Sequence, residues 1–201
     1  MNPRLLRAIL DGGGAISGSY ATAPTSTNLT TNGTEDWVHW GKTDITSYNH
    51  KANVQSKLSA LTVLAGTLQR FSPVSWDFSW TDGTPDATGT TIQTGLYIQN
   101  LNGGYRFTAA ADIVRRRLIL YVKAYNSTLQ IRASVSDASF PDLVDATLND
   151  TANNTPMSAF TIDYNAARNG QTLTIDVTNI HENAAPGSND IGLNAATLIL
   201  L

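Results

Sequence analysis

The chain has 201 residues, 14% of them charged, and a formal net charge of −3. This acidic balance excludes a general electrostatic attraction to nucleic acid or to an anionic membrane. Cysteine is absent, which excludes disulfides, thiolate metal sites and thiol nucleophiles. The length and a hydrophobic content of 41% fit one well-buried domain.

Residues 1–25 differ from the rest of the chain. Residues 1–10 are apolar and basic, residues 12–14 are glycines, and a Ser-, Thr-, Ala- and Pro-containing stretch follows without the alternation that seeds a strand. The apolar run is too short for the core of a signal peptide, so none is expected. We predict an extended anchoring arm and linker here, with these residues docking on a partner subunit: Arg4, Leu5, Leu6, Arg7, Ile9 and Leu10.

The opening Pro3-Arg4-Leu5-Leu6-Arg7 resembles the short arms that begin a number of tailed-phage structural proteins. In those proteins the arm precedes a separate β-rich domain, and a proline usually follows the second arginine, where this chain has Ala8. The resemblance implies a virion structural protein, either a capsid decoration or a tail-associated protein.

From Ser26 onward, short apolar segments are separated by Gly, Asn, Asp and Pro turns. The densest stretch is residues 33–41, Gly-Thr-Glu-Asp-Trp-Val-His-Trp-Gly. If it is a strand, Trp37 and His39 point to one face while Val38 and Trp40 point to the other. One tryptophan is then expected in the core, and the other is a candidate for the surface.

Further along the chain, two β-hairpins are predicted. Residues 95–98 and 105–107 flank Asn102-Gly103-Gly104, which is a hairpin signal. Residues 117–125 and 129–135 each alternate between a core face and a surface face on either side of Asn126-Ser127. The charge run Arg115-Arg116-Arg117 would fan to both faces of the strand start, which favours a solvated edge over an anion site.

The later segments 160–164, 173–177 and 193–201 repeat the same pattern, with Asn169-Gly170 as another turn. Short strands, frequent turns and the lack of a helical stretch predict an all-β fold. We expect an antiparallel β-sandwich of jelly-roll type over residues 26–201, with an open barrel as the alternative.

An ordered series of short segments resembles a β-sandwich module of large secreted bacterial proteins, similar in architecture to carbohydrate-binding modules. The resemblance covers most of residues 26–201 and implies the fold and a binding surface. It is carried by residues 33–41, Asn49-His50-Lys51, residues 79–85, Leu120-Tyr121-Val122 with Ala124-Tyr125, and Ser134-Val135-Ser136-Asp137.

No catalytic motif is recognised, and the adjacent Glu35 and Asp36 would face opposite sides of a strand, so a non-enzymatic protein is predicted. Exposed aromatic rings stack on sugars while polar side chains direct hydrogen bonds, which makes four residues candidates for glycan binding. These are Trp37, Trp40, Tyr48 and His50. The competing interpretation is that the tryptophans fill the core and that an Asp or His locks two sheets through an indole N–H.

Calcium is the cofactor that the sequence suggests, because hard-cation ligands recur in two loop-like stretches. Turn capping by the aspartate side chains is the favoured interpretation, so no cofactor and no metal ligand is predicted. The stretches contain Asp137, Asp142, Asp145 and Asp150, and Asp77, Asp82 and Asp86.

Two functions are consistent with these features. The first is a non-enzymatic virion protein, anchored by its arm in an oligomeric assembly with other virion subunits and displaying a sandwich that binds surface polysaccharide. The alternative is a carbohydrate-binding module of a secreted bacterial protein. Both place the chain on a virion or an extracellular surface, and exposure of Trp37 or Trp40 beside Tyr48 and His50 would favour glycan binding.

Overall fold

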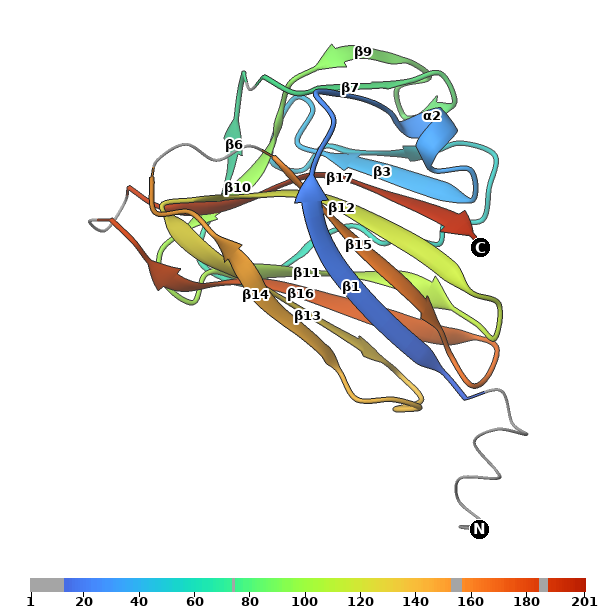
Figure 1. The fold of residues 1–201 in the computed structure, drawn as a ribbon. Coiled ribbons are helices and arrows are strands. Elements are labelled where there is room, and N and C mark those ends of the chain that lie inside the picture. Colours follow the sequence, from blue (N-terminus) through green and yellow to red (C-terminus); the bar gives the residue numbers. More distant parts are fainter. Residues whose placement is uncertain (1–12, 74, 153–156, 185–187) are drawn as a thin grey trace.

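A computed structural model of the protein describes residues 13–73, 75–152, 157–184 and 188–201 (Figure 1). The larger of its sheets has nine strands in the order β1-β15-β12-β17-β3-β4-β8, with β10 pairing β17 and β6 pairing β10. The strands are β1 (Ala15–Thr22), β15 (Ser158–Asn165), β12 (Arg116–Tyr125), β17 (Asp190–Leu200), β3 (Asp36–Trp40), β4 (Tyr48–Lys51), β8 (Gly83–Thr84), β10 (Gly95–Gln99) and β6 (Leu68–Phe71).

A five-stranded sheet in the order β14-β13-β16-β11-β5 packs against the inner face of the larger sheet (Figure 1). Its strands are β14 (Leu143–Asn149), β13 (Ser127–Val135), β16 (Gln171–Glu182), β11 (Gly104–Ala111) and β5 (Thr62–Ala65). Alternate side chains of both sheets meet in one core, as Leu120 of β12 and Ile131 of β13 do. The predicted antiparallel β-sandwich of jelly-roll type is therefore confirmed.

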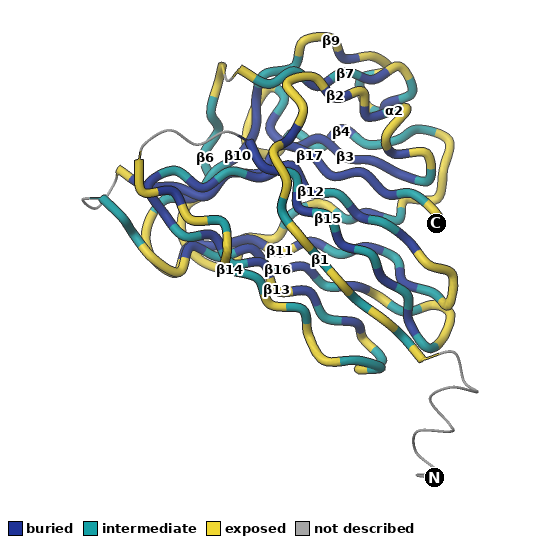
Figure 2. Tube along the Cα trace, in the orientation of Figure 1, coloured by how far each residue is buried: buried dark blue, intermediate teal, exposed yellow. Residues whose placement is uncertain are grey.

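A third layer, absent from the prediction, lies on the outer face of the larger sheet. It consists of β2 (Ser26–Asn28), α2 (Leu29–Asn32), β7 (Asp77–Trp80) and β9 (Gly89–Ile92). Leu29, Phe78 and Trp80 pack against Trp37 and Tyr121 of the sheet beneath, forming a second hydrophobic cluster. The third layer covers the outer face of β3. As a result, β3 is buried along its whole length, although its sheet is an outer layer of the sandwich (Figure 2).

Neither predicted hairpin exists. The strands of the first predicted hairpin are β10 and β11, and those of the second are β12 and β13. In each pair the first strand belongs to the larger sheet and the second to the five-stranded sheet. The turns therefore carry the chain from one sheet to the other. An alternating sequence shows that a strand has a buried face, but it does not show which strand it bonds to.

The prediction that residues 1–25 form an arm and a linker is wrong for Ala15–Thr22, which form the strand β1. This strand pairs with β15 along its whole length, from Ala15 opposite Asn165 to Thr22 opposite Ser158. Ile16 and Tyr20 pack on the main core, and the Tyr20 and Phe160 rings lie 4.4 Å apart. The sandwich therefore begins before Ser26. The anchoring residues Arg4 to Leu10 lie outside the described residues, so the arm stays a prediction.

Truncation separates these two parts of the N-terminal region. A protein that lacks residues 1–22 is expected to have a free energy of unfolding about 3 kcal/mol lower than a protein that lacks residues 1–12, because Ile16 and Tyr20 no longer bury apolar area. Urea unfolding followed by tryptophan fluorescence measures both. Equal stability of the two truncated proteins would contradict the role assigned to β1.

Candidate functional site: a groove on the outer face of the larger sheet

The two tryptophans predicted for glycan binding are not accessible. The predicted alternation along β3 is confirmed, since Trp37 and His39 point outward and Val38 and Trp40 point into the main core. The third layer covers the outward face, so Trp37 is 0% exposed and Trp40 is 2% exposed. Neither ring can stack on a sugar, which corrects that part of the prediction.

Tyr48 and His50 are half-buried and stack on each other, with ring centroids 4.9 Å apart. The Tyr48 hydroxyl donates a hydrogen bond of 2.7 Å to the carbonyl oxygen of Leu58. Tyr48 and Trp40 line one hollow of about 370 Å³, whose other lining residues are mainly apolar, such as Leu61. This hollow offers a sugar few polar partners, so the predicted four residues do not form a glycan site.

Trp37 instead takes part in the indole lock that the sequence offered as the alternative. Its Nε1 donates a 2.9 Å hydrogen bond to Asp82, which also accepts a bond from the Thr30 hydroxyl and pairs with Lys51 Nζ at 2.6 Å. Burial raises the pKa of Asp82, but the bonds from Lys51, Thr30 and Trp37 outweigh it and hold that pKa below its ordinary value. The third layer is thus fastened to the larger sheet at Asp82.

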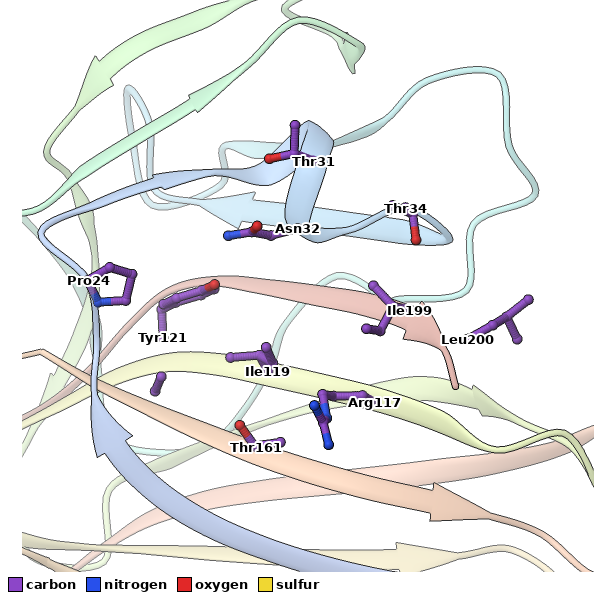
Figure 3. Close-up of a pocket in the computed structure, with 11 residues that line it drawn as sticks. Pro24, Thr31, Asn32, Thr34, Arg117, Ile119, Tyr121, Thr161, Ile199 and Leu200 are labelled. Carbon is purple, nitrogen blue, oxygen red and sulfur yellow. The ribbon is translucent and has the colours of Figure 1, made fainter.

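An open groove lies beside the third layer, on the same outer face (Figure 3). Its volume is about 460 Å³. Ile119 and Tyr121 of β12, Thr161 of β15 and Ile199 of β17 lie along its floor, and α2 overhangs it with Asn32 (Figure 3). The remaining lining residues are Pro24, Thr31, Thr34, Arg117, Ala159 and Leu200.

The groove continues into a second hollow of about 190 Å³ toward the edge strand β1. Arg117 and Thr161 line both hollows, which makes them contiguous, and Ser17, Gly18, Ser19 and Asp163 complete the second. Together the hollows cross β17, β12, β15 and β1, four neighbouring strands. Three spacings between strands give the groove a length of about 14 Å.

Strand register builds the floor of this groove. Arg117, Ile119 and Tyr121 are the outward residues at the start of β12, and they stand opposite outward residues of β15, which in turn stand opposite those of β1. The rows are Arg117, Asp163 and Ser17; Ile119, Thr161 and Ser19; and Tyr121, Ala159 and Ala21. Small side chains on β15 and β1 keep the second hollow open.

Asp163 carries the negative charge of the groove and is held by arginine. Arg117 donates from Nε and Nη2 to the two carboxylate oxygens at 2.6 and 2.7 Å, and Arg115 lies 3.5 Å from one of them. The hydrogen bonds from Arg117 hold the pKa of Asp163 below its ordinary value. Among the described residues lining the two hollows, Asp163 is the only acid, so that lining holds no carboxylate pair of the kind used in glycoside hydrolysis.

The aspartates of the two loop-like stretches take part in turns and ion pairs. Asp137 accepts backbone N–H groups of Ser139 and Ala167, and Asp142 pairs with Arg132. Over the described ranges, no group of three or more His, Cys, Asp or Glu side chains is placed to hold a metal ion. In the same part of the chain, no helix has the length and apolar character to cross a bilayer.

The sequence matches no protein-family model, and no curated protein matches it. Among solved structures, it is similar to the carbohydrate-binding module TmCBM61 in complex with β-1,4-galactotriose, at 8% identity over 71% of this chain and 88% of that chain, with a TM-score of 0.41. It is also similar to the K1 cleaved adhesin domain of Lys-gingipain from Porphyromonas gingivalis W83, at 8% identity over 91% and 98% of the two chains, with a TM-score of 0.40.

A third similar structure is the enzymatically active domain of bacteriophage CBA120 tailspike protein 4, at 12% identity over 73% of this chain and 20% of that chain, with a TM-score of 0.38. The described residues define the class of the protein as an antiparallel β-sandwich with an added outer layer.

Proposed function

We propose that the protein is a non-enzymatic binding module that holds an extended polysaccharide in the outer-face groove. The observation that carries the proposal is the mixed lining of the groove. Ile119, Ala159 and Ile199 offer an apolar floor, while Asn32 and Thr161 offer an amide and a hydroxyl beside it. A sugar ring has an apolar C–H face and a rim of hydroxyl groups, so it matches such a lining on both counts.

The shape of the groove supports a chain rather than a compact ligand. The groove is open to solvent and runs across four strands for about 14 Å, the scale of a short oligosaccharide. The groove lies between α2, which overhangs it, and the floor that β12 and β15 form, and these elements are far apart in the sequence (Figure 3). A polymer could therefore lie along the floor with several units in contact.

Filling the groove tests the proposal. Thr161→Tyr places a large ring where the two hollows meet, and it is expected to weaken polysaccharide binding at least about tenfold by occupying the ligand's space. A glycan array identifies a ligand, and affinity electrophoresis in gels containing that polymer measures binding. The matched control is Thr174→Tyr on β16, a half-buried threonine on the outer face of the five-stranded sheet.

The expected result is retardation of the wild type and of Thr174→Tyr, with loss of retardation for Thr161→Tyr. Unchanged binding by a folded Thr161→Tyr would move the site away from the groove. If the wild type binds nothing on an array that includes bacterial surface polysaccharides and plant polymers, the proposed function is wrong.

We further propose that the module is displayed on a virion surface, with residues 1–10 as its anchor. This rests on the tailed-phage resemblance of the first residues, and it is supported by the position of β1, which leads from residues 1–12 into an edge of the larger sheet. Protein lacking residues 1–12 should remain folded but fail to join the particle fraction of its source. A protein that is indifferent to particles at full length would favour the alternative, a module of a secreted bacterial protein.

A further inference from the structure

The arginine triplet at the start of β12 divides between the two faces of the larger sheet. Arg116 points inward, is 5% exposed, and pairs with Glu35 at 3.0 Å and Asp112 at 2.8 Å. Arg115 and Arg117 instead converge on Asp163 at the outer face. The expectation of a solvated edge therefore does not hold for Arg116, and the other two arginines stand at the groove.

The outer pair leaves an excess of positive charge at the groove, where Arg117 belongs to the lining and Arg115 lies just outside it, next to Asp163. Two guanidinium groups share one carboxylate, and that carboxylate is already held by two bonds from Arg117. The Arg115 side chain is 58% exposed and that of Arg117 is 39% exposed, whereas Asp163 is only 15% exposed. Arg117 binds Asp163 through Nε and Nη2, so its Nη1 group is not engaged by that carboxylate.

Hydroxyl donors surround this charge. Ser17, Ser19 and Thr161 line the same hollow of about 190 Å³ as Arg117. A carboxylate accepts several hydrogen bonds at once, and its bonds to guanidinium are stronger than bonds between neutral groups. The apolar floor at Ile119 adjoins this hollow through Arg117 and Thr161, so a ring and its acidic substituent can be held side by side.

We propose that the groove selects an acidic polysaccharide. The carboxylate of a uronic acid unit binds at Arg117 and Arg115 and at the hydroxyls of the second hollow, while the sugar ring lies on the floor beside Ile119. This inference rests on the proposed function and adds the class of ligand to it. The chain as a whole carries a net charge of −3, so attraction to a polyanion has to come from this local excess rather than from the overall charge.

The test compares polymers that differ only in charge. The probes are polygalacturonate and alginate, each beside its carboxyl-reduced, neutral derivative, in affinity electrophoresis at fixed ionic strength. The wild type is expected to bind at least one acidic polymer about tenfold more tightly than its reduced form, the effect of one charge-assisted hydrogen bond. Arg117→Gln should abolish this preference, and Arg115→Gln should reduce it severalfold.

Two further variants sharpen the result. Asp163→Asn removes the internal competitor for both arginines and is expected to strengthen binding to the acidic polymer severalfold. Arg132→Gln is the matched control. Arg132 lies on β13 of the five-stranded sheet, is exposed, and pairs with Asp142. It should bind as the wild type does, and thermal unfolding confirms that each variant is folded.

Equal binding of acidic and reduced polymers by the wild type overturns the acidic selection and leaves the polysaccharide function standing. Parallel losses in Arg117→Gln and Arg132→Gln would also overturn it, since the attraction would then be unspecific. If Arg117→Gln fails to fold, the more exposed Arg115→Gln and the opposite effect of Asp163→Asn decide the question. Failure to bind any acidic or neutral polymer contradicts the proposed function itself.

Discussion

Replacing Asp82 by alanine is expected to lower the free energy of unfolding by about 3 kcal/mol. The change removes the acceptor of the Trp37 indole, a fully buried side chain, and an unsatisfied buried donor costs about 1–3 kcal/mol. It also removes the bonds from Thr30 and Lys51, of which the Lys51 pair contributes less because Asp82 is partly exposed. Urea unfolding followed by tryptophan fluorescence gives the value.

Asp82→Asn separates the indole bond from the charge, because an amide oxygen still accepts from Trp37. Its destabilisation should lie between that of alanine and the wild type. The matched control is Asp86→Ala, which breaks a surface pair with Lys42 and should cost less than about 1 kcal/mol. If Asp82→Ala costs no more than Asp86→Ala, Asp82 does not fasten the third layer.

The hydrogen bonds of Asp82 also hold α2 in place, since Thr30 belongs to α2. This helix overhangs the groove, so its position affects the shape of the groove. A protein whose third layer is loosened would keep the sandwich but lose this overhang. Asp82→Ala should therefore weaken polysaccharide binding under conditions in which the protein is still folded. The binding loss distinguishes the lock from an ordinary stabilising contact elsewhere.

Lowering the pH from 7 to 5 is expected to cost the protein about 2 kcal/mol of stability through His39. His39 is fully buried between Phe78 and Trp80, whose ring centroids each lie 5.5 Å from that of the imidazole. Burial lowers the pKa of His39 from 6.5 to about 3, and the positive charges of Lys42 and Arg70 act in the same direction.

The sign of the effect follows from proton binding. Between pH 6.5 and about 3, His39 is protonated in the unfolded chain but stays neutral in the folded protein. Stability due to this group is thus complete above pH 6.5 and is lost as the pH falls toward 3. Asp36 and Asp190, whose pKa values are raised chiefly by burial, act in the opposite direction at low pH.

His39→Gln isolates the His39 contribution. The difference in unfolding free energy between pH 7 and pH 5 should shrink by about 2 kcal/mol in this variant, because the aspartate contributions are common to both proteins. His181→Gln serves as the control, since His181 is exposed on β16. An identical pH dependence in the wild type and His39→Gln would show that His39 is not the group responsible.

Local pattern alone determined much of this fold. The alternation around Trp37 and Trp40 predicted which side chains share a face, and the same alternation along β12 predicted that Leu118, Leu120 and Val122 are core residues. The all-β sandwich and the indole lock were both within reach of the sequence. These features depend on side-chain periodicity and on the chemistry of single residues, which neighbouring positions in the chain already express.

The partners of each strand were decided only by the tertiary structure. Every strand offers the same backbone hydrogen-bonding groups, whatever its sequence. The alternation in β12 and β13 therefore could not show that these strands lie in opposite sheets. The strand β1 was not predicted, because Gly18 interrupts the inward face between Ile16 and Tyr20 and leaves too few apolar side chains to mark an alternation.

The candidate site depended on the same long-range pairing. Arg117, Thr161 and Ser19 are scattered along the chain, and only the register of β12, β15 and β1 brings them together on one face. The sequence determined that Arg117 and Ile119 point the same way, and the third layer decided that Trp37 is covered while the groove beside it is open. Periodicity is local and can be read from the sequence, whereas the burial of an outward face depends on distant segments that pack over it.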